Sequence, residues 1–279
     1  MSYVDLLKES AKKTKSIVCL GLDPDIDKIP LKEENDEKNI FLFYKNMLDA
    51  AVSENLINTV KPNYAFYAQY GFPGLRALKK IIEFCKEKGL IVILDAKRGD
   101  IGNTAKAYAK EVFEFWNADA VTLSPFLGSD SLTPFLEYCK NGKGAYILLK
   151  TSNPGANDLQ NLKVGDKFVY EKLGEKILEW HQPGAGVVIG ATYPEELEKL
   201  SEFFVKSKKE IPILIPGVGK QGGSASDVVK ILKKTKNDLL IHRINSSSGI
   251  NYAYEKYKLD YVESAVKALK ELKDEIGKI

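Results

Sequence analysis

A (β/α)8 barrel, an α/β fold, is predicted by three features: eight short apolar runs, helical segments between them, and the chain length. The runs do not alternate between apolar and polar residues, which is typical of parallel strands covered on both faces. The chain has 279 residues, and one such barrel typically has ~250. We therefore expect residues 1–279 to form a single domain with a short N-terminal helix. The expected strands are 16–23, 58–63, 90–97, 120–125, 145–152, 186–192, 212–217 and 239–247.

Amphipathic segments with helical spacing separate these runs. In 74–88 (GLRALKKIIEFCKEK) apolar residues recur every three or four positions, and 195–207 and 226–234 behave alike. Strands that alternate with helices imply a parallel sheet with right-handed crossovers. A doubly wound open sheet would also fit this alternation, but eight units favour a closed barrel.

Composition and charge exclude several classes of protein. The 41 basic and 38 acidic residues are spread along the chain, so neither nucleic acid nor a membrane surface is expected as a partner. Cys19, Cys85 and Cys139 lie far apart, which argues against a disulfide framework and favours a cytoplasmic protein. His181 and His242 form no ligand cluster, so no metal site is expected. No run reaches the ~18 consecutive apolar residues that a membrane span needs.

Charged residues stand at the ends of three expected strands. Asp95 and Lys97 are two positions apart at the end of the third strand, so both side chains should point into the barrel mouth. Lys61 ends the second strand, where Pro62 keeps it extended, and Asp23 ends the first. The carboxyl ends of barrel strands carry the catalytic groups in barrel enzymes. We therefore expect these charges to converge on one site.

Such a cluster of ammonium and carboxylate groups can carry out acid–base chemistry. Opposite charges at short range keep each other ionised and fix each other's rotamers. A protonated lysine can donate to a developing carbanion, and a carboxylate aimed at a substrate carboxylate repels it until carbon dioxide leaves. Each residue also has a plain structural interpretation: Asp100 as a helix N-cap, Asp95 and Lys97 as an ion pair, Lys61 as a solvated strand end.

Two long loops follow the fifth and seventh strands on the same face. Residues 153–163 are polar and residues 217–226 (GVGKQGGSAS) are rich in glycine, so both are candidate lids. Backbone N–H groups after the seventh strand can also hold a phosphate, as barrels often do there. The glycine-rich loop is not a P-loop, because the Gly-Lys-Ser/Thr ending is missing.

The segment DAKRGDIGNT at 95–104 resembles the Asp-x-Lys-x-x-Asp signature of the orotidine 5′-monophosphate decarboxylase family. Further segments are similar to the bacterial and plasmodial branch of that family and occur in order from residue 21 to about residue 254. The single motif is moderately specific, and the ordered set is highly specific. These segments are GLDP at 21–24, KPN at 61–63, SPFLG at 124–128, TSNPG at 151–155, GAT at 190–192 and PGVGKQGG at 216–223.

The resemblance implies a carboxy-lyase that needs no cofactor and converts orotidine 5′-monophosphate (OMP) to uridine 5′-monophosphate (UMP) in de novo pyrimidine biosynthesis. It also implies a homodimer whose active sites are shared across the interface. Lys61, Asp95 and Lys97 map onto the family's charged tetrad, which Asp100 of the partner subunit would complete. Lys97 would protonate carbon 6 of the pyrimidine as carbon dioxide leaves, and Asp95 would hold both lysines in place.

The same resemblance assigns contacts to the rest of the nucleotide. Asp23, Lys61 and the partner's Thr104 would contact ribose hydroxyls. Ser152 would meet the pyrimidine edge, and the turn with Gln221 would grip the phosphate. The implied substrate-binding residues are Asp23, Asn63, Ile101, Thr104, Ser152, Pro216, Gly217, Gln221, Ser247, Ser248 and Gly249.

One departure from the family lies just past the eighth strand, at Ser248, where members usually carry an arginine that pairs with the phosphate. Losing a charged contact should weaken phosphate binding, and it can slow the reaction because remote contacts stabilise the transition state. Backbone N–H and hydroxyl groups of residues 246–249 can compensate. Arg243, inside the strand, is a less favourable substitute.

Three other functions, two of them enzymatic, fit part of the pattern. Related barrel enzymes with a similar motif act on sugar phosphates and are expected to use Mg²⁺. A Schiff-base aldolase using Lys61, Lys97 or Lys150 would need a neutral amine, which carboxylates beside Lys97 disfavour. The chain could also be a non-catalytic barrel that binds nucleotides, although a pure binder would not need the charged tetrad.

Overall fold

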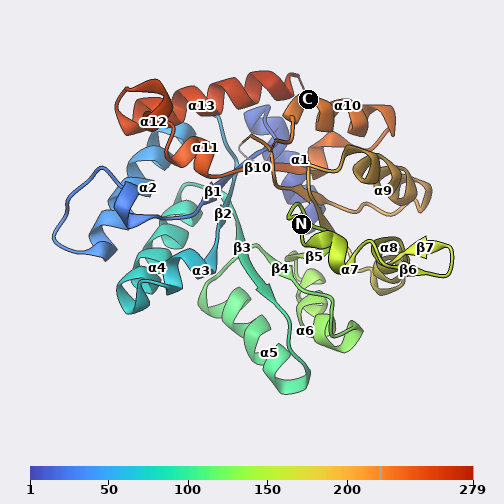
Figure 1. The fold of residues 1–279 in the computed structure, drawn as a ribbon. Helices are drawn as coiled ribbons and strands as arrows, with labels where there is room; N and C mark the ends of the chain where they lie inside the picture. Colours follow the sequence, from blue (N-terminus) through green and yellow to red (C-terminus); the bar gives the residue numbers. More distant parts are fainter. Residues whose placement is uncertain (220–221, 279) are drawn as a thin grey trace.

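Eight parallel strands close into a barrel in this computed structural model, which describes residues 1–219 and 222–278. The order around the barrel is β1-β10-β9-β8-β5-β4-β3-β2 (Figure 1). The predicted (β/α)8 fold is confirmed, and each expected strand region overlaps one barrel strand. The strands are β1 (Val18–Leu22), β2 (Thr59–Pro62), β3 (Ile91–Arg98), β4 (Ala120–Leu123), β5 (Gly144–Lys150), β8 (Ala185–Ile189), β9 (Ile213–Ile215) and β10 (Arg243–Ser246).

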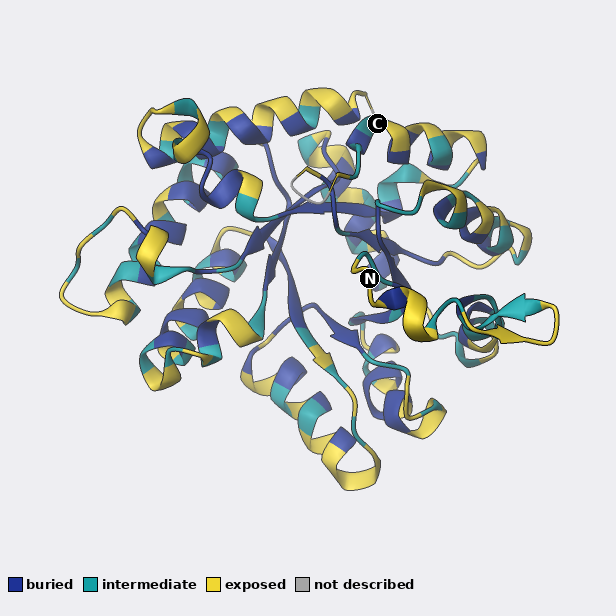
Figure 2. Cartoon of the chain, in the orientation of Figure 1, coloured by how far each residue is buried: buried dark blue, intermediate teal, exposed yellow. Residues whose placement is uncertain are grey.

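Helices surround the barrel and bury their apolar faces against it. Figure 2 shows buried residues on the sides of the helices that face the strands and exposed residues on the outer sides. In α4, for example, the buried Leu78, Ile82 and Cys85 recur at helical spacing. Helices α4, α9 and α10 confirm the three expected helical segments. The outer helices are α2 (Asp36–Ser53), α4 (Gly71–Glu87), α5 (Gly102–Lys110), α6 (Ser129–Cys139), α8 (Val169–Trp180), α9 (Pro194–Lys206), α10 (Ala225–Lys234) and α13 (Tyr261–Ile276).

Shorter elements occupy the connections and the N-terminus. The loop after β5, a candidate lid in the sequence, contains a helical turn and a small antiparallel hairpin. The short elements are α1 (Tyr3–Thr14), η1 (Ile26–Lys28), α3 (Tyr64–Ala68), η2 (Glu111–Phe115), α7 (Ala156–Leu159), β6 (Lys163–Val164), β7 (Lys167–Phe168), η3 (Leu239–Ile241), α11 (Ser248–Asn251) and α12 (Tyr254–Tyr257).

The last barrel strand is shorter than the sequence predicted. Residues 239–247 were expected to be extended throughout, but their first part forms the 3-10 turn η3. The Asp238 carboxylate accepts from the Leu240 N–H at 3.1 Å, and the Leu240 carbonyl accepts from Arg243 Nη1 at 3.1 Å. These local hydrogen bonds give backbone N–H and C=O groups of the turn their partners, so no neighbouring strand is needed there. An apolar run alone does not distinguish the turn from a strand.

The amino-terminal end of the barrel is closed by α1 and by Arg243, which is fully buried. All five N–H groups of the guanidinium have acceptors, and every acceptor is neutral. The acceptors are Thr59 Oγ1, Ser10 Oγ and the carbonyl oxygens of Leu7, Leu240 and His242, at 2.7 to 3.1 Å. We conclude that Arg243 ties α1 to the bottom of the barrel.

No helix of the described chain combines the length and apolar character needed to cross a membrane. Cys19, Cys85 and Cys139 are buried and form no disulfide. Across residues 1–219 and 222–278, no three His, Cys, Asp or Glu side chains gather in a way that could hold a metal ion.

Candidate active site

A cavity of about 710 Å³ opens at the carboxyl-terminal ends of the barrel strands. Each barrel strand, or the loop directly after it, contributes to the lining, so the cavity is the mouth of the barrel. Residues far apart in sequence meet here, as predicted from the strand ends. The predicted site residues that line it are Asp23, Lys61, Asn63, Asp95, Lys97, Ser152, Pro216, Gly217, Ser247, Ser248 and Gly249.

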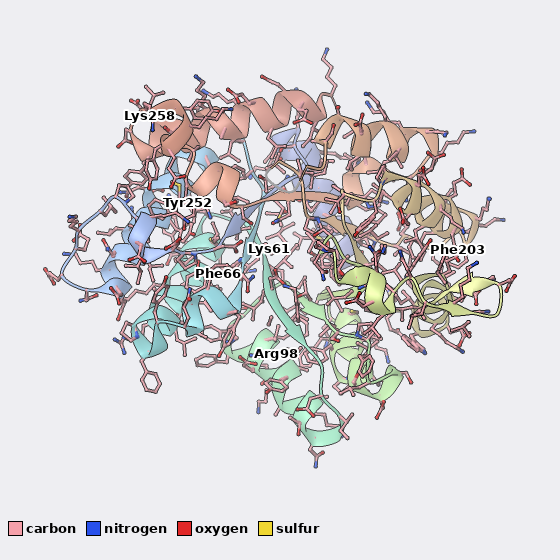
Figure 3. All side chains as sticks on the ribbon, in the orientation of Figure 1. Lys61, Phe66, Arg98, Phe203, Tyr252 and Lys258 are labelled. Atoms are coloured by element: carbon pink, nitrogen blue, oxygen red, sulfur yellow. The ribbon has the colours of Figure 1, made fainter. Side chains whose placement is uncertain are left out.

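Asp95 binds both lysines in this cavity. Its Oδ2 accepts from Lys61 Nζ at 2.6 Å, and its Oδ1 accepts from Lys97 Nζ at 2.7 Å. Lys61, labelled near the centre of the barrel in Figure 3, is almost fully buried, whereas the Lys97 side chain is 50% exposed. Of the two ammonium groups, that of Lys97 is therefore the one open to a ligand.

Strand β3 is irregular where it carries these groups. Its pairing with β4 shifts register between Leu94 and Arg98, and Lys97 has a left-handed backbone with φ of 46°. Such conformations are strained for residues other than glycine and recur at functional sites. Thr122 Oγ1 accepts from the Lys97 N–H at 3.0 Å and donates to Asp95 Oδ1 at 2.8 Å. One threonine therefore supports both the strained backbone and the carboxylate.

The charges in the cluster keep one another ionised. Burial by itself would raise the pKa of Asp95, but the charges and hydrogen bonds of Lys61 and Lys97 outweigh it and hold this pKa well below its usual range. Burial would likewise lower the pKa of Lys61, but the negative charges of Asp95 and Asp23 outweigh it and raise this pKa above its usual value. Near neutral pH, Asp95 is a carboxylate and Lys61 an ammonium group.

Two buried oxygen atoms of the cavity residues lack a hydrogen-bond partner among the described residues. They are Asp23 Oδ1 and Asn245 Oδ1. A buried acceptor without a donor is unfavourable, so a ligand that carries hydroxyl or N–H groups would be stabilised here. Gly21 allows this part of the wall to close, since a Cβ at Gly21 would lie 1.8 Å from Ser247 Oγ.

The loop after β5 forms another part of the wall and is folded back on itself. Gln160 Oε1 accepts from the Thr151 N–H at 2.9 Å, and Gln160 Nε2 donates to Thr151 Oγ1 at 2.8 Å. Both residues line the cavity together with Ser152 and Asn153. The loop therefore presents Ser152 from a fixed backbone.

Lys150, at the end of β5, is fully buried and lies behind this wall. Its Nζ donates to Asn161 Oδ1 at 2.9 Å and lies 4.3 Å from the centre of the Tyr193 ring. Burial lowers the pKa of Lys150. Lys150 is absent from the described lining of the cavity, so it is poorly placed to form a Schiff base with a ligand there.

The turns after β9 and β10 supply backbone and hydroxyl groups to the cavity. Pro216, Gly217 and residues 247–249 line it, and Gly217 has φ of 93°, which favours glycine. Gln221 lies outside the described residues. Arg243 is committed to the other end of the barrel, which agrees with the expectation that it does not replace the arginine absent at Ser248.

Asp100, Ile101 and Thr104 lie outside the described lining of their own chain's cavity. The structural interpretation of Asp100 as a helix N-cap is wrong, because Ile101 occupies that position before α5. Asp100 Oδ1 instead accepts from the Ile101 N–H at 2.8 Å. Ile101 is 54% exposed. A role for these residues in a second subunit's site stays a prediction.

Sequence reasoning missed several residues of the cavity. Thr122 could have been found, because it is a polar residue inside the otherwise apolar strand β4. Asn245 lacks this signal, because Arg243 and Ser246 make β10 polar as well. Tyr252 could not have been found, because it enters the site through a tertiary contact: its hydroxyl donates to the Asp23 carbonyl, after the neighbouring strand β1, at 3.0 Å. The missed residues also include Asp25, Lys28, Phe66, Leu148, Val188 and Leu214.

Sequence relatives share the whole barrel. Residues 16–275 match the family model described as Orotidine 5'-phosphate decarboxylase / HUMPS family. The chain is 40% identical over 261 residues to an orotidine 5'-phosphate decarboxylase of Delftia acidovorans, covering 91% of this chain and 90% of that one. Its identity to the protein of the same name from Variovorax paradoxus is 39% over 282 residues, covering 98% and 97% of the two chains.

Solved structures give the same result. The OMP decarboxylase of Leishmania donovani superposes with a TM-score of 0.78 at 34% identity, covering 99% of this chain and 98% of that one. The UMP synthase of the same organism has a TM-score of 0.81 at 36% identity, and this chain spans only 56% of its length. By its sequence, its fold and the residues gathered at its barrel mouth, the chain belongs to the orotidine 5'-phosphate decarboxylase / HUMPS family.

Proposed function

We propose that this chain catalyses the cofactor-independent decarboxylation of OMP to UMP, a step of pyrimidine biosynthesis. One observation carries the proposal: Asp95 binds two ammonium groups inside the cavity, and one of them, that of Lys97, remains half-exposed. Relatives at about 40% identity over most of the chain are named for this reaction. The charges at the barrel mouth suit a reaction in which a carboxylate leaves and a proton takes its place.

In the proposed reaction the bond between carbon 6 and the carboxyl carbon breaks, and its electron pair stays on carbon 6. The half-exposed ammonium of Lys97 donates a proton to that carbon, so OMP and one proton give UMP and carbon dioxide. The Asp95 carboxylate holds the donor by its hydrogen bond at 2.7 Å. Lys61 is enclosed beside Asp95 and balances its charge, which keeps the carboxylate ionised.

The same electrostatics disfavour a Schiff-base aldolase. A lysine nucleophile must be neutral, and the raised pKa of Lys61 keeps this residue charged near neutral pH. Lys97 Nζ donates to the Asp95 carboxylate at 2.7 Å, so nucleophilic attack by this amine would have to break that hydrogen bond. Both lysines are therefore better suited to binding and protonation than to nucleophilic attack.

For the rest of the nucleotide, we propose contacts from three parts of the cavity. Asp23 Oδ1, which has no hydrogen-bond partner within residues 1–219 and 222–278, would accept from a ribose hydroxyl. Ser152 would meet the pyrimidine edge from the loop after β5. The phosphate would bind at the turns after β9 and β10, where Gly217 and residues 247–249 lie and where the predicted Gln221 would also belong.

A homodimer with shared sites is also proposed. Its support is the exposed apolar surface beside the barrel mouth, where Ile101, Phe126 and Leu127 are 54%, 82% and 46% exposed. The loops that carry them are adjacent, because the Ser124 N–H donates to the Arg98 carbonyl at 2.7 Å. Apolar patches of this kind mark association surfaces. In such a dimer, Asp100 and Thr104 of the partner subunit would complete each site.

The reaction is tested by adding the pure protein to OMP and following the loss of orotidylate absorbance together with UMP formation. We expect one UMP per OMP consumed and no change on treatment with EDTA. Tight UMP binding without turnover would instead favour a non-catalytic nucleotide-binding barrel. Loss of activity with EDTA would favour a Mg²⁺-dependent sugar-phosphate enzyme. The cytoplasmic location and the lack of a nucleic-acid partner stay predictions.

Shared sites are tested by subunit mixing. Lys97→Ala and Asp100→Ala proteins should each be nearly inactive, because each lacks one member of the tetrad at every site. A mixed dimer would regain one intact site, so a mixture should recover about a quarter of wild-type activity at random assortment. No recovery in a mixture shown to contain mixed dimers would contradict the donation of Asp100 across the interface.

A further inference from the structure

Arg98, which directly follows the proposed proton donor, is enclosed by side chains from three elements. Both oxygens of Glu111 accept from Arg98 Nη2, at 2.8 and 2.9 Å. The guanidinium also lies 4.7 Å from the centre of the Tyr64 ring and 4.4 Å from that of Tyr108. We call these four residues the Arg98 box. Hydrogen bonds between charged groups and cation–π contacts together fix the direction of the arginine.

The acidic member of the box is held by its own neighbours. Glu111 begins the π-helical turn η2, and its Oε1 also accepts from Trp116 Nε1 at 2.8 Å. Tyr64 packs edge-on against Trp116, with ring centres 6.2 Å apart. Single π-helical turns are rare and frequently occur at functional sites. The π-helical turn therefore anchors the carboxylate that binds Arg98.

The box lies at the far end of the irregular part of β3. The register shift spans Leu94 to Arg98, and the left-handed Lys97 lies inside it. On the backbone side, Arg98 pairs with Leu123 of β4, and its carbonyl accepts from the Ser124 N–H at 2.7 Å. A strained residue keeps its conformation only when its surroundings hold it on both sides. Thr122 holds Lys97 on one side, and Arg98 holds it on the other.

The direction of the Lys97 ammonium depends on this backbone. Its side chain is half-exposed, and Asp95 is its partner in the described cluster. A long side chain with one partner follows any rotation of its backbone, and a misplacement of about 1 Å can slow a reaction about 100-fold. Figure 3 labels Arg98 away from the centre of the barrel, beside α5, and it is absent from the described lining of the cavity.

We propose that Arg98 is a positioning residue for the reaction: the Arg98 box holds the bulge of β3 so that Lys97 aims its ammonium into the cavity. The inference rests on the proposed function, because it assigns Lys97 the proton transfer. It predicts that loss of the box lowers kcat without weakening the binding of nucleotide. A merely structural ion pair would lower stability and leave kcat of the folded protein unchanged.

The experiment compares Arg98→Met with a matched control, Arg76→Met. Arg76 also pairs with a glutamate, at 2.5 Å from Glu37, but it joins α4 to α2 on the surface. Arg98→Met should lower kcat about 10- to 100-fold while the Kd for UMP, measured by calorimetry, changes less than about twofold. Arg76→Met should leave both quantities unchanged. Glu111→Gln, which keeps the shape of the side chain, should lower kcat in the same direction by a smaller factor.

A double-mutant cycle completes the test. The effects of Arg98→Met and Glu111→Gln on kcat should be non-additive, because both remove the same contact. Wild-type kcat in a folded Arg98→Met protein would overturn the inference, as would a parallel loss of kcat and UMP affinity. Should Arg98→Met fail to fold, Glu111→Gln decides by the same two measurements. Wild-type protein that binds UMP but does not act on OMP would refute the proposed function instead.

Discussion

The two ends of the barrel bury cations in opposite ways. At the bottom, the five N–H groups of Arg243 all donate to neutral acceptors, and the residue is sealed from solvent. At the mouth, Lys61 and Lys97 share one carboxylate, and Lys97 is half-exposed in a cavity of about 710 Å³. In the same cavity, one oxygen each of Asp23 and Asn245 lacks a hydrogen-bond partner in the described part of the chain.

This difference shows which buried charge belongs to function. When every N–H group of a buried cation already has a hydrogen-bond acceptor, the cation contributes to the fold and has no free donor for a ligand. The mouth instead combines charge, strain and unsatisfied acceptors, a combination that persists only where the surrounding structure holds it in place. Four substitutions test this contrast, two at each end, in order of decreasing effect.

Removing the exposed ammonium at the mouth should have the largest effect. Lys97→Ala should lower kcat about 1,000-fold, or about 4 kcal/mol, because the proposed proton donor is lost. The urea midpoint should stay close to wild type, since half of this side chain is exposed and Asp95 keeps Lys61 as a partner. Lys12→Ala, at an exposed position of α1, is the control for a lost charge. Unchanged turnover would refute the proton-transfer role of Lys97.

Removing the cation at the bottom should destabilise the protein without changing the chemistry. Arg243→Met leaves carbonyl and hydroxyl groups without donors, so the free energy of unfolding in urea should fall by about 3 kcal/mol. The kcat per folded molecule should match wild type, because Arg243 is outside the described cavity lining. Arg76→Met, on the surface, should change neither quantity. A strong drop in the kcat of fully folded Arg243→Met protein would contradict the proposed distinction between the two ends.

At the mouth, the hydroxyl of Thr122 is the next group to remove. Thr122→Val keeps the shape but deletes the donor to Asp95 and the acceptor for the Lys97 N–H. A hydrogen bond to a charged group is worth enough that kcat should fall about tenfold. Thr133→Val, on the exposed side of α6, is the matched control. Steady-state kinetics that show equal kcat in both variants would mean that Thr122 does not support the cluster.

The fourth substitution, at the bottom, should have the smallest effect near neutral pH, and its effect should grow as the pH falls. Burial and the charge of Arg243 lower the pKa of His242 from 6.5 to about 3, while its Nδ1 accepts from the Ile213 N–H at 3.0 Å. The folded state therefore excludes a proton that the unfolded chain binds below about pH 6.5. Its contribution to stability is complete above that pH and falls by up to about 1.4 kcal/mol for each unit below it.

His242→Gln isolates this contribution, because glutamine can accept from the same N–H group but does not titrate. Urea unfolding between about pH 7 and pH 5 should show a shallower loss of stability in the variant than in wild type. The slopes of the free energy of unfolding against pH should differ by up to the value expected for one bound proton. Identical slopes would mean that His242 already binds its proton in the folded protein.

Much of the barrel and of its mouth could be predicted from local sequence. Eight apolar runs with helical segments between them gave the fold, and alternation along β3 placed Asp95 and Lys97 on one side. The error at residues 239–247 arose because an apolar run does not report the local hydrogen bonds of Asp238 that form η3. The alternative interpretation of Asp100 as a helix N-cap was also wrong, since Ile101 occupies that position, whereas its role in a second subunit's site stays a prediction.

The sequence by itself therefore determined the order of the elements and the charged residues at the strand ends, because both follow from periodicity along one segment. Only the tertiary structure decided which of those charges meet, how far Lys97 is exposed, and that Tyr64, Tyr108 and Glu111 enclose Arg98. These contacts join residues from different elements. Their distances depend on barrel closure and on the register shift in β3, which no local pattern records.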